Sequence, residues 1–187
     1  MIKTLILLRH GQYTKQPTER LTALGRKQAQ LAGKRLQEFN INKVFVSTMP
    51  RAKETSEISL KKLKRSFKPE SCDFLRECVP GFPKALRKKY GFTNLKELKK
   101  DKMQADRAFK KYFTFSKTKR TELLVCHGNI IRYLVCKSLG IDTDSWTKFD
   151  IKQCGITIVE LNSKDNSIKV IGHNDVGHIP IEMQTFI

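Results

Sequence analysis

Two short segments of this sequence place an imidazole beside groups that bind phosphate. Arg9-His10-Gly11 follows directly on the apolar residues 5–8, and His127-Gly128-Asn129 follows a second apolar run that ends at Cys126. Such uninterrupted apolar runs are typical of strands that are buried on both faces, as in a parallel sheet. Ligands of open α/β sheets bind in the crevice at the carboxyl ends of the strands. We therefore expect the two histidines to contribute to one phosphate-handling site.

A third strand end carries a further cation. The short apolar run at residues 44–46 leads into a segment in which Ser47 or Thr48 is the expected N-cap and Pro50 occupies the first helical turn. Arg51 is then expected in the same turn, beside backbone N–H groups without partners in the helix and the positive end of the helix dipole. Its guanidinium group and that of Arg9 can bind one phosphoryl group bidentately.

A carboxylate completes the groups that phosphoryl transfer requires. Glu77 follows a short strand expected over residues 72–75, and its carboxyl group can protonate a leaving oxygen. The alternative is that Glu77 is a solvated charge. With one imidazole as nucleophile and a second as donor, these groups suffice for in-line transfer through a covalent phosphohistidine. The attacking imidazole has to be neutral, and Arg9 and Arg51 would favour that form by disfavouring imidazolium.

The remaining sequence predicts strands and helices in alternation, which would carry these groups to one edge of a sheet. The expected elements after the first strand are a helix at residues 23–39 with Thr22 as N-cap, a strand at 44–46, a helix from residue 50 to about 64, a strand at 72–75, one or two amphipathic helices within 84–119, a strand at 122–126, a helix from about 130 to 139, and a hairpin of strands 155–161 and 168–171. This order predicts an α/β fold with helices on both faces of a mostly parallel sheet.

Length and cysteine content limit the class of protein. A chain of 187 residues can bury its own core, and we expect a single domain over residues 1–187 because no repeat or linker divides it. The five cysteines include no C-x-x-C pair, which favours reduced thiols over a disulfide scaffold or a zinc site. Cys126 is expected in the core, because neighbouring residues of a strand point to opposite faces. The spacing of His173 and His178 fits no standard metal motif, so we expect structural roles for both.

The formal net charge of +19 is large for a chain of this length. Residues 84–120 hold fourteen Lys and Arg against three Asp and Glu, so 11 of the 19 net charges lie in that segment. The charge predicts attraction to anionic partners, but charge alone does not separate nucleic acid, phosphoprotein, membrane surfaces and small phosphates. No recognised nucleic-acid motif is present, so no specific nucleic acid is expected, and the default interpretation of the segment is a solvated helix face.

The first residues contain no recognisable targeting segment. The apolar residues 5–8 are too few for a signal peptide, and no stretch approaches the roughly 20 apolar residues that a membrane span needs. We therefore expect no membrane span and a cytoplasmic location.

Four motifs, in order along the chain, resemble those of the histidine phosphatase (phosphoglycerate-mutase-like) superfamily. They are Arg9-His10-Gly11, an L-T-x-x-G-x-x-Q-A pattern at residues 21–29, an S-x-x-x-R-A-x-x-T pattern at residues 47–55, and Cys126-His127-Gly128-Asn129. The resemblance covers essentially the whole chain. It implies a phosphoglycerate-mutase-like three-layer α/β sandwich with a mostly parallel central sheet, and catalysis without a metal or cofactor.

The resemblance also implies a role for each matching residue. His10 is the implied phosphorylated nucleophile, and Glu77 is the implied proton donor. The implied ligands of the phosphoryl group are Arg9, Arg51 and His127. The further candidate substrate-binding residues are Gly11, Gln12, Thr22 and Asn129. For Gln12 and Thr22 the alternatives are a loop and a cap, and for Asn129 a helix cap and a phosphate contact both stay open.

Within the superfamily, the segments at residues 11–13, 75–77 and 129–136 resemble the mitochondrial serine/threonine protein phosphatase branch most. The sequence starts at the catalytic core, without that branch's membrane anchor and multimerisation segment, so location and assembly are not carried over. We expect a metal-independent phosphatase that forms a phosphohistidine, acts on phosphoserine and phosphothreonine of proteins, and releases inorganic phosphate.

Three other functions stay open. Within the family, the alternatives are a protein phosphohistidine phosphatase and a small-metabolite phosphatase. Mutase activity is disfavoured, because only 25 residues separate Arg51 from Glu77 and 49 separate Glu77 from His127, which leaves little chain for an enclosing lid. The alternative of another class is a basic module that binds nucleic acid or membrane while its pocket stays idle.

Overall fold

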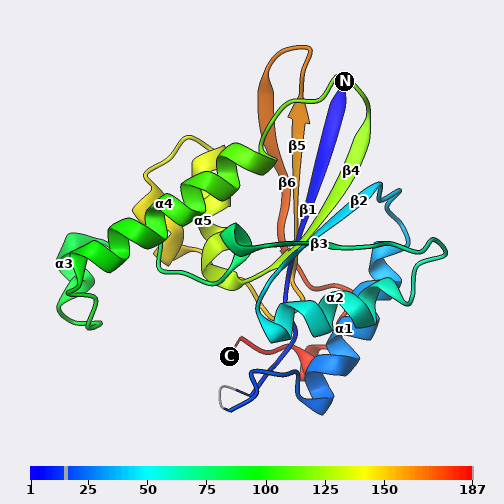
Figure 1. Cartoon of the computed structure of the whole chain (residues 1–187), viewed down its shortest axis with the longest axis horizontal. Helices are drawn as coiled ribbons and strands as arrows, with labels where there is room; N and C mark the ends of the chain where they lie inside the picture. Colours follow the sequence, from blue (N-terminus) through cyan, green and yellow to red (C-terminus); the bar gives the residue numbers. More distant parts are fainter. Residues whose placement is uncertain (15–16, 187) are drawn as a thin grey trace.

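The computed structural model describes residues 1–14 and 17–186, and its centre is a six-stranded sheet. The strands lie in the spatial order β3-β2-β4-β1-β5-β6 (Figure 1). Their bounds are β1 Ile2–Arg9, β2 Lys43–Ser47, β3 Glu70–Cys72, β4 Arg120–Cys126, β5 Ile156–Asn162 and β6 Ser167–Asp175. Strands β3, β2, β4 and β1 are parallel to one another, whereas β5 and β6 add an antiparallel hairpin beside β1. The mostly parallel sheet predicted from the sequence is confirmed.

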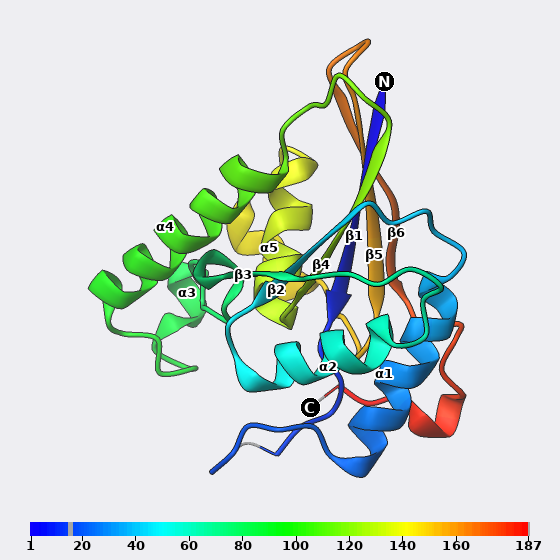
Figure 2. The same cartoon turned by 45° about the vertical axis from the view of Figure 1, so that its right-hand side comes forward.

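Helices cover both faces of this sheet (Figures 1 and 2). Helices α1 (Ala23–Leu36) and α2 (Pro50–Leu60) lie on one face, and α4 (Leu95–Tyr112) and α5 (Gly128–Ser138) lie on the other. The shorter elements are α3 (Lys84–Arg87) and the 3-10 turns η1 (Asp73–Leu75), η2 (Thr143–Lys148) and η3 (Ile181–Met183). The three layers agree with the predicted α/β sandwich.

The apolar residues of β1 pack alternately into two apolar clusters, one on each face of the sheet. Leu5 and Leu7 belong to the apolar cluster under α4 and α5, whereas Ile6 and Leu8 belong to the cluster under α1 and α2. All four side chains are completely buried. Because successive strand residues point to opposite faces, one uninterrupted apolar run serves both clusters.

The parallel register brings the predicted site segments to one edge of the sheet. Arg9 of β1 is paired with Cys126 of β4, and the backbone N–H of His10 donates to the Cys126 carbonyl at 3.0 Å. His10 and His127 therefore leave adjacent strands at the same level. Ser47 is the last residue of β2, the neighbour of β4 on its other side.

The loop after β1 lies so close to the start of α1 that two positions accept only glycine. A Cβ atom on Gly25 would lie 1.9 Å from the Gln12 carbonyl oxygen, and one on Gly11 would lie 2.6 Å from the Gly25 carbonyl oxygen. Both obstacles are backbone atoms, which cannot rotate away as a flexible side chain can. This close approach holds the residue after His10 against α1.

Several predicted boundaries differ from the structure. Helix α1 ends at Leu36 and not at residue 39, because the next three N–H groups bond to carbonyls only three residues earlier and tighten the chain into a turn. Helix α2 likewise ends at Leu60, before a turn at residues 61–63. The strand expected over residues 72–75 is β3 followed by the turn η1, and the basic region divides into the short α3 and the long α4.

The cap prediction holds for α1 and is wrong for α2. The Thr22 hydroxyl accepts from Gly25 N at 3.0 Å, as an N-cap should. The N-cap of α2 is Met49, whose side chain makes no capping hydrogen bond within the described residues. Ser47 and Thr48 do not cap it because the Ser47 hydroxyl bonds to His127 and the Thr48 hydroxyl donates to Asp73 at 2.7 Å.

Candidate active site

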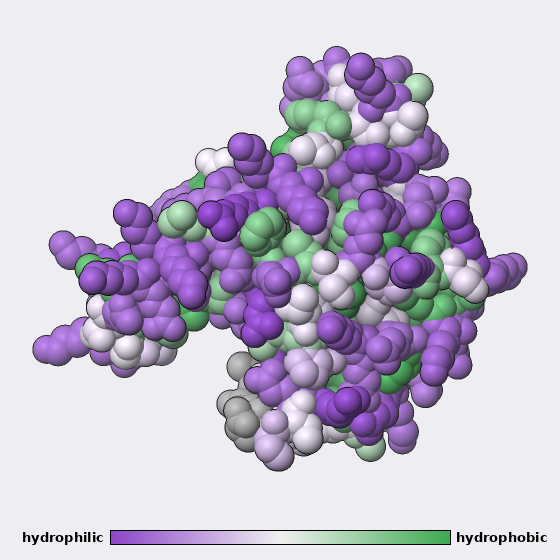
Figure 3. Space-filling view, in the orientation of Figure 1, coloured by the Kyte–Doolittle hydropathy of each residue, from purple (hydrophilic) through white to green (hydrophobic). Residues whose placement is uncertain are grey.

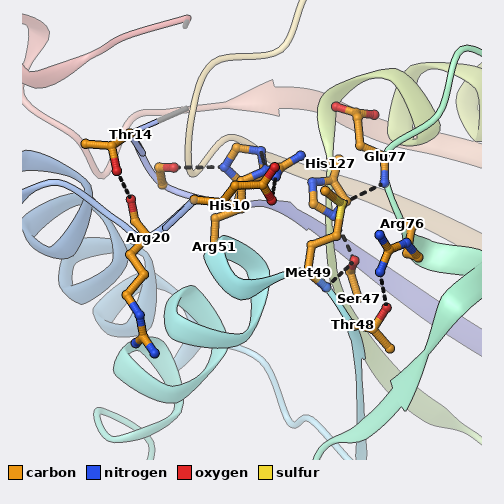
Figure 4. A network of polar contacts seen from close by, with 12 residues as sticks. His10, Thr14, Arg20, Ser47, Thr48, Met49, Arg51, Arg76, Glu77 and His127 are labelled. Atoms are coloured by element: carbon orange, nitrogen blue, oxygen red, sulfur yellow. Dashed lines mark hydrogen bonds and ion pairs between the residues drawn. The ribbon is translucent and has the colours of Figure 1, made fainter. Parts of the chain in front are cut away.

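The imidazole of His10 is buried and held in one tautomer by its two contacts (Figure 4). Its Nδ1 lies 2.8 Å from the Gly11 carbonyl oxygen, and its Nε2 lies 3.2 Å from Nε of Arg51. A carbonyl can only accept and a guanidinium can only donate, so the proton resides on Nδ1 and Nε2 presents its lone pair. The lone pair needed by a nucleophile is therefore on the nitrogen that faces Arg51.

Burial and nearby cations keep this imidazole neutral. Burial is the main cause that lowers the pKa of His10 well below its ordinary value, and the positive charges of Arg9 and Arg51 lower it further. At neutral pH His10 therefore carries no charge.

His127 lies beside His10, with the two ring centroids 5.0 Å apart. Its Nε2 is 2.8 Å from the Ser47 hydroxyl, which itself accepts from Met49 N at 3.3 Å. The hydroxyl can in addition donate its own proton to Nε2, and in that arrangement the ring proton of a neutral His127 is on Nδ1. Within residues 1–14 and 17–186, this buried Nδ1 has no hydrogen-bond partner. Burial, followed by His10 and Arg51, lowers the pKa of His127 well below its ordinary value.

The two predicted phosphate-binding arginines are also buried. Arg9 donates through one terminal nitrogen to the Ile151 carbonyl, and its Nε has no partner among the residues that the structure describes. Arg51 has its guanidinium carbon 4.5 Å from the ring centroid of Tyr13 and pairs with the Glu19 carboxylate at 2.8 Å. Two guanidinium groups thus approach His10 from different elements.

Glu77 lies at the same edge, after the turn η1. Its Oε1 accepts from Asn129 N at 3.2 Å and from Cys78 N at 3.4 Å. Burial raises the pKa of the Glu77 carboxyl group, while Arg9 and Arg51 oppose that shift. The net upward direction favours the protonated acid at a higher pH than is usual for a glutamate.

A cavity of about 430 Å³ lies at this edge of the sheet. Its lining includes Arg9, His10, Tyr13, Glu77 and Arg132. Arg51 and His127 lie behind this lining, each in direct contact with His10. The structure therefore brings together the five residues that the sequence assigned to phosphoryl chemistry.

The four other predicted substrate-binding residues make contacts within the protein. Gly11 donates its N–H to the Thr55 hydroxyl at 3.1 Å, and its carbonyl accepts from His10. Gln12 accepts from the Thr22 hydroxyl at 2.7 Å, so these two side chains bind each other. These contacts of Gly11, Gln12 and Thr22 fix the loop that follows His10.

Asn129 lines the cavity but is not a helix cap, because the N-cap of α5 is His127. Its side-chain nitrogen donates to the Cys78 carbonyl at 3.0 Å, and its side-chain oxygen accepts from Arg132. Together with the backbone N–H bound to Glu77, these contacts fix the segment that carries the carboxyl group.

Three residues of this site were not predicted from the sequence in their actual positions. The sequence assigns no role to Glu19, indicates only a cap for Ser47, and places Arg132 only within a segment that resembles a family branch. Arg132 is four positions after Gly128 and so lies on the face of α5 that starts at the site; this helical spacing could have indicated its role. No local pattern pairs Glu19 with Arg51 or Ser47 with His127.

Cys126 and His173, both expected to be structural, have ordinary surroundings, whereas the two ring nitrogens of His178 are buried without a hydrogen-bond partner among the described residues. Cys126 is completely buried, as predicted, and burial raises the pKa of its thiol. His173 lies 3.0 Å from the Thr157 hydroxyl and 2.8 Å from the Asp150 carbonyl oxygen. Among the described residues, no three His, Cys, Asp or Glu side chains are grouped so that they could hold a metal ion. None of the helices in this part of the chain has the length and apolar character to cross a bilayer.

Comparison with known proteins gives consistent matches. A family model described as "Histidine phosphatase superfamily (branch 1)" matches residues 5–89 and 89–174 of this chain. A curated relative, the mitochondrial serine/threonine-protein phosphatase Pgam5 of Drosophila yakuba, is 36% identical over 193 residues. The alignment covers 97% of this chain and 66% of the relative, so the chain spans slightly less than two thirds of that protein.

Two solved structures share the fold. YhfR of Bacillus stearothermophilus aligns with a TM-score of 0.75 and 25% identity, over 95% of this chain and 100% of its own. The phosphoglycerate mutase of Plasmodium falciparum aligns with a TM-score of 0.66 and 26% identity, over 96% of this chain and 95% of its own. The predicted phosphoglycerate-mutase-like fold is confirmed.

The expected location is wrong. The cytoplasmic location is contradicted by the curated relatives, which are named as mitochondrial proteins. That expectation depended on finding no targeting segment among the first residues, and such an observation does not determine a compartment.

Proposed function

This chain belongs to the histidine phosphatase superfamily, and on that premise we propose that it hydrolyses phosphomonoesters through a phosphohistidine on His10. We further propose that its substrates are phosphoserine and phosphothreonine residues of proteins. The observation that carries the proposal is the state of the His10 ring. Its proton is on Nδ1 against Gly11, and the lone pair of Nε2 faces the Arg51 guanidinium, while the nearby charge of Arg9 further disfavours the protonated ring.

In the first step, Nε2 of His10 attacks phosphorus as the bond between phosphorus and the substrate oxygen breaks. Glu77 gives its proton to that oxygen, which leaves as an alcohol. Arg9 and Arg51 neutralise charge on the phosphoryl oxygens during the transfer, and the Nδ1–H of His127 donates a hydrogen bond to one of them. Among the described residues, Arg9 Nε and His127 Nδ1 have no hydrogen-bond partner, which supports these two donor roles.

In the second step, water attacks the phosphohistidine and the phosphorus–nitrogen bond breaks. The Glu77 carboxylate takes a proton from the attacking water, which restores the acid for the next cycle. Inorganic phosphate leaves, and the electron pair returns to Nε2. The same carboxyl group therefore acts first as acid and then as base.

Two observations support a protein substrate. The 25 residues between Arg51 and Glu77 form α2, β3 and η1, and the 49 between Glu77 and His127 form mainly α3, α4 and β4, so little chain is left for a lid over a small sugar phosphate. The similar Pgam5 proteins are named as serine/threonine-protein phosphatases. A cavity without such a lid suits a phosphorylated side chain on a protein surface.

We expect this enzyme to prefer phosphopeptides to small metabolites. Measured at equal concentration, kcat/KM for phosphoserine and phosphothreonine peptides should exceed that for 3-phosphoglycerate by about 10-fold or more, which corresponds to roughly 1.4 kcal/mol of additional transition-state binding. A phosphohistidine peptide belongs in the same panel. Comparable kcat/KM for phosphopeptides and 3-phosphoglycerate would contradict the proposed substrate class.

The ion pair between Glu19 and Arg51 leads to a second prediction. A carboxylate 2.8 Å from the Arg51 guanidinium competes with the dianionic substrate for the same donor. Glu19→Gln should therefore lower KM for an aryl phosphate by about 3- to 10-fold, the range expected for loss of a partly exposed charge pair. Steady-state kinetics of Glu57→Gln, an exposed glutamate of α2, provide the control. An unchanged or higher KM in Glu19→Gln would mean that Glu19 does not oppose substrate binding.

A further inference from the structure

A second cavity, of about 440 Å³, lies between helix α4 and the segment of η1. Figure 3 shows that hydrophilic residues gather over α4, with small apolar patches between them. The cations that line this cavity, which we call the basic groove, are Arg76, Lys96, Lys99, Lys100 and Arg107. All five are exposed, so the groove offers a concentrated positive charge to solvent.

The groove uses one face of α4. Lys96, Lys99, Lys100, Met103 and Arg107 follow helical spacing, and all of them line the cavity. The opposite, buried side of the helix carries Leu98, Ala105, Ala108 and Tyr112. The groove face of α4 is therefore separate from the face that packs into the core.

The carboxylates near α4, including the exposed Glu97 in its first turn, form no ion pair with the groove cations among the described residues. Asp106 pairs with Lys102 and Lys137, and Asp101 accepts from Val79 N at 2.7 Å. The acidic residue of the groove lining, Asp73, accepts from the Thr48 hydroxyl. Within residues 1–14 and 17–186, the five cations form no ion pair with a carboxylate. Their charge is thus available to a partner.

The groove also contains apolar surface. The lining includes Phe74, which is partly buried and packs against the core. It also includes Met103, an apolar side chain that is 49% exposed. The guanidinium carbon of Arg107 lies 5.8 Å from the Phe74 ring centroid. Cations around an apolar patch match a peptide that has acidic residues and an apolar side chain.

Arg76 connects the groove to the candidate active site. It precedes Glu77 in the chain, and Figure 4 shows both side chains on the segment beside His127. Its guanidinium donates to the Thr48 hydroxyl at 3.1 Å, and its carbonyl accepts from Gln104 of α4 at 2.8 Å. A peptide whose phosphorylated residue is at His10 would reach the groove along this segment.

We propose that the basic groove binds an acidic segment of the phosphoprotein substrate, close in sequence to the phosphorylated residue. Acidic side chains would pair with the lysines of α4, and an apolar side chain would contact Phe74 and Met103. This assignment rests on the proposed phosphatase function and adds the kind of sequence that surrounds the phosphate. Nucleic acid and anionic membrane are the competing partners for the same charge.

Charge reversal in the groove tests this assignment. Lys99→Glu/Lys100→Glu should lower kcat/KM for a phosphoserine peptide with acidic flanks by about 10-fold or more, and should leave an aryl phosphate and a peptide with glutamine flanks within about 2-fold. Lys117→Glu/Lys119→Glu changes the net charge equally at exposed positions outside the groove, and is the matched control. Anisotropy of a labelled, unphosphorylated acidic peptide measures binding without catalysis.

The outcomes separate this assignment from the proposed function. Equal losses in the two double variants, or equal wild-type kcat/KM for acidic and glutamine flanks, would overturn the groove as a docking site. Tighter binding of a DNA duplex or of phosphatidylserine vesicles through Lys99 and Lys100 would also overturn it. If the aryl phosphate is hydrolysed but neither phosphopeptide is, the proposed substrate class fails, and the anisotropy measurement still reports on the groove.

Discussion

His10→Ala should reduce kcat by at least ~10⁴-fold, the scale on which enzymes lose activity when a covalent nucleophile is removed. The reason is that Nε2 of His10 is the atom proposed to bond to phosphorus, and alanine offers no atom in its place. Arg9, Arg51 and His127 would still bind a phosphoryl group. Substrate binding should therefore survive in this variant while turnover is lost.

The measurement combines phosphate release with detection of the intermediate. Wild-type protein mixed with an aryl phosphate and quenched in alkali should carry an acid-labile phosphoryl group on the peptide that contains His10, and His10→Ala should carry none. His178→Gln removes another largely buried imidazole, near the end of α1, and should retain both activity and phosphoenzyme. Normal turnover by His10→Ala would end the proposal.

Much of the fold could be predicted because its signals are local. Residues 5–8 and 123–126 are apolar without interruption, and a strand buried on both faces needs that pattern. Thr22 and Pro50 mark helix starts through their own hydrogen bonding and ring geometry. Parallel strands then bring His10 and His127 to one edge without further information.

The details of the candidate site could not be predicted because they depend on contacts between distant segments. Ser47 has the composition of a cap, but its hydroxyl lies 2.8 Å from His127, which is 80 residues away. Glu19 is in a loop whose sequence predicts only polarity, yet its carboxylate reaches Arg51. Asn129 could be a cap or a ligand from sequence, and only the position of Cys78 and Arg132 decides which atoms it binds.

The causes of the pKa shifts also divide into those that the sequence predicts and those that require the structure. That Arg9 and Arg51 favour a neutral His10 follows from their charges and from the expectation that strand ends meet. That burial is the larger cause follows only from the packed structure, in which the ring is 1% exposed. For Glu77, burial and the arginines act in opposite directions, so the sign of the pKa shift required the three-dimensional arrangement.

The most informative test of Glu77 is a comparison of leaving groups. Glu77→Gln should lower kcat/KM for a phosphoserine peptide by about 10²- to 10⁴-fold, the usual contribution of a general acid, because serine must leave as an alcohol. The kcat/KM of the same variant for p-nitrophenyl phosphate should fall by less than about 10-fold, since p-nitrophenolate leaves without a proton. Steady-state kinetics of Glu57→Gln on both substrates provide the control.

The pH dependence of kcat/KM also tests Glu77 as the proton donor. Burial raises the pKa of Glu77, so its acid form persists above the ordinary range of a glutamate, and wild-type kcat/KM for the phosphoserine peptide should fall as pH rises through that raised value. On the acid side, His10 stays neutral until pH falls through its lowered pKa, so activity should extend below the ordinary range of a histidine. In Glu77→Gln the alkaline decline should disappear while the acid limb stays. Equal losses on the two substrates, or an unchanged alkaline limb, would assign the proton to another group.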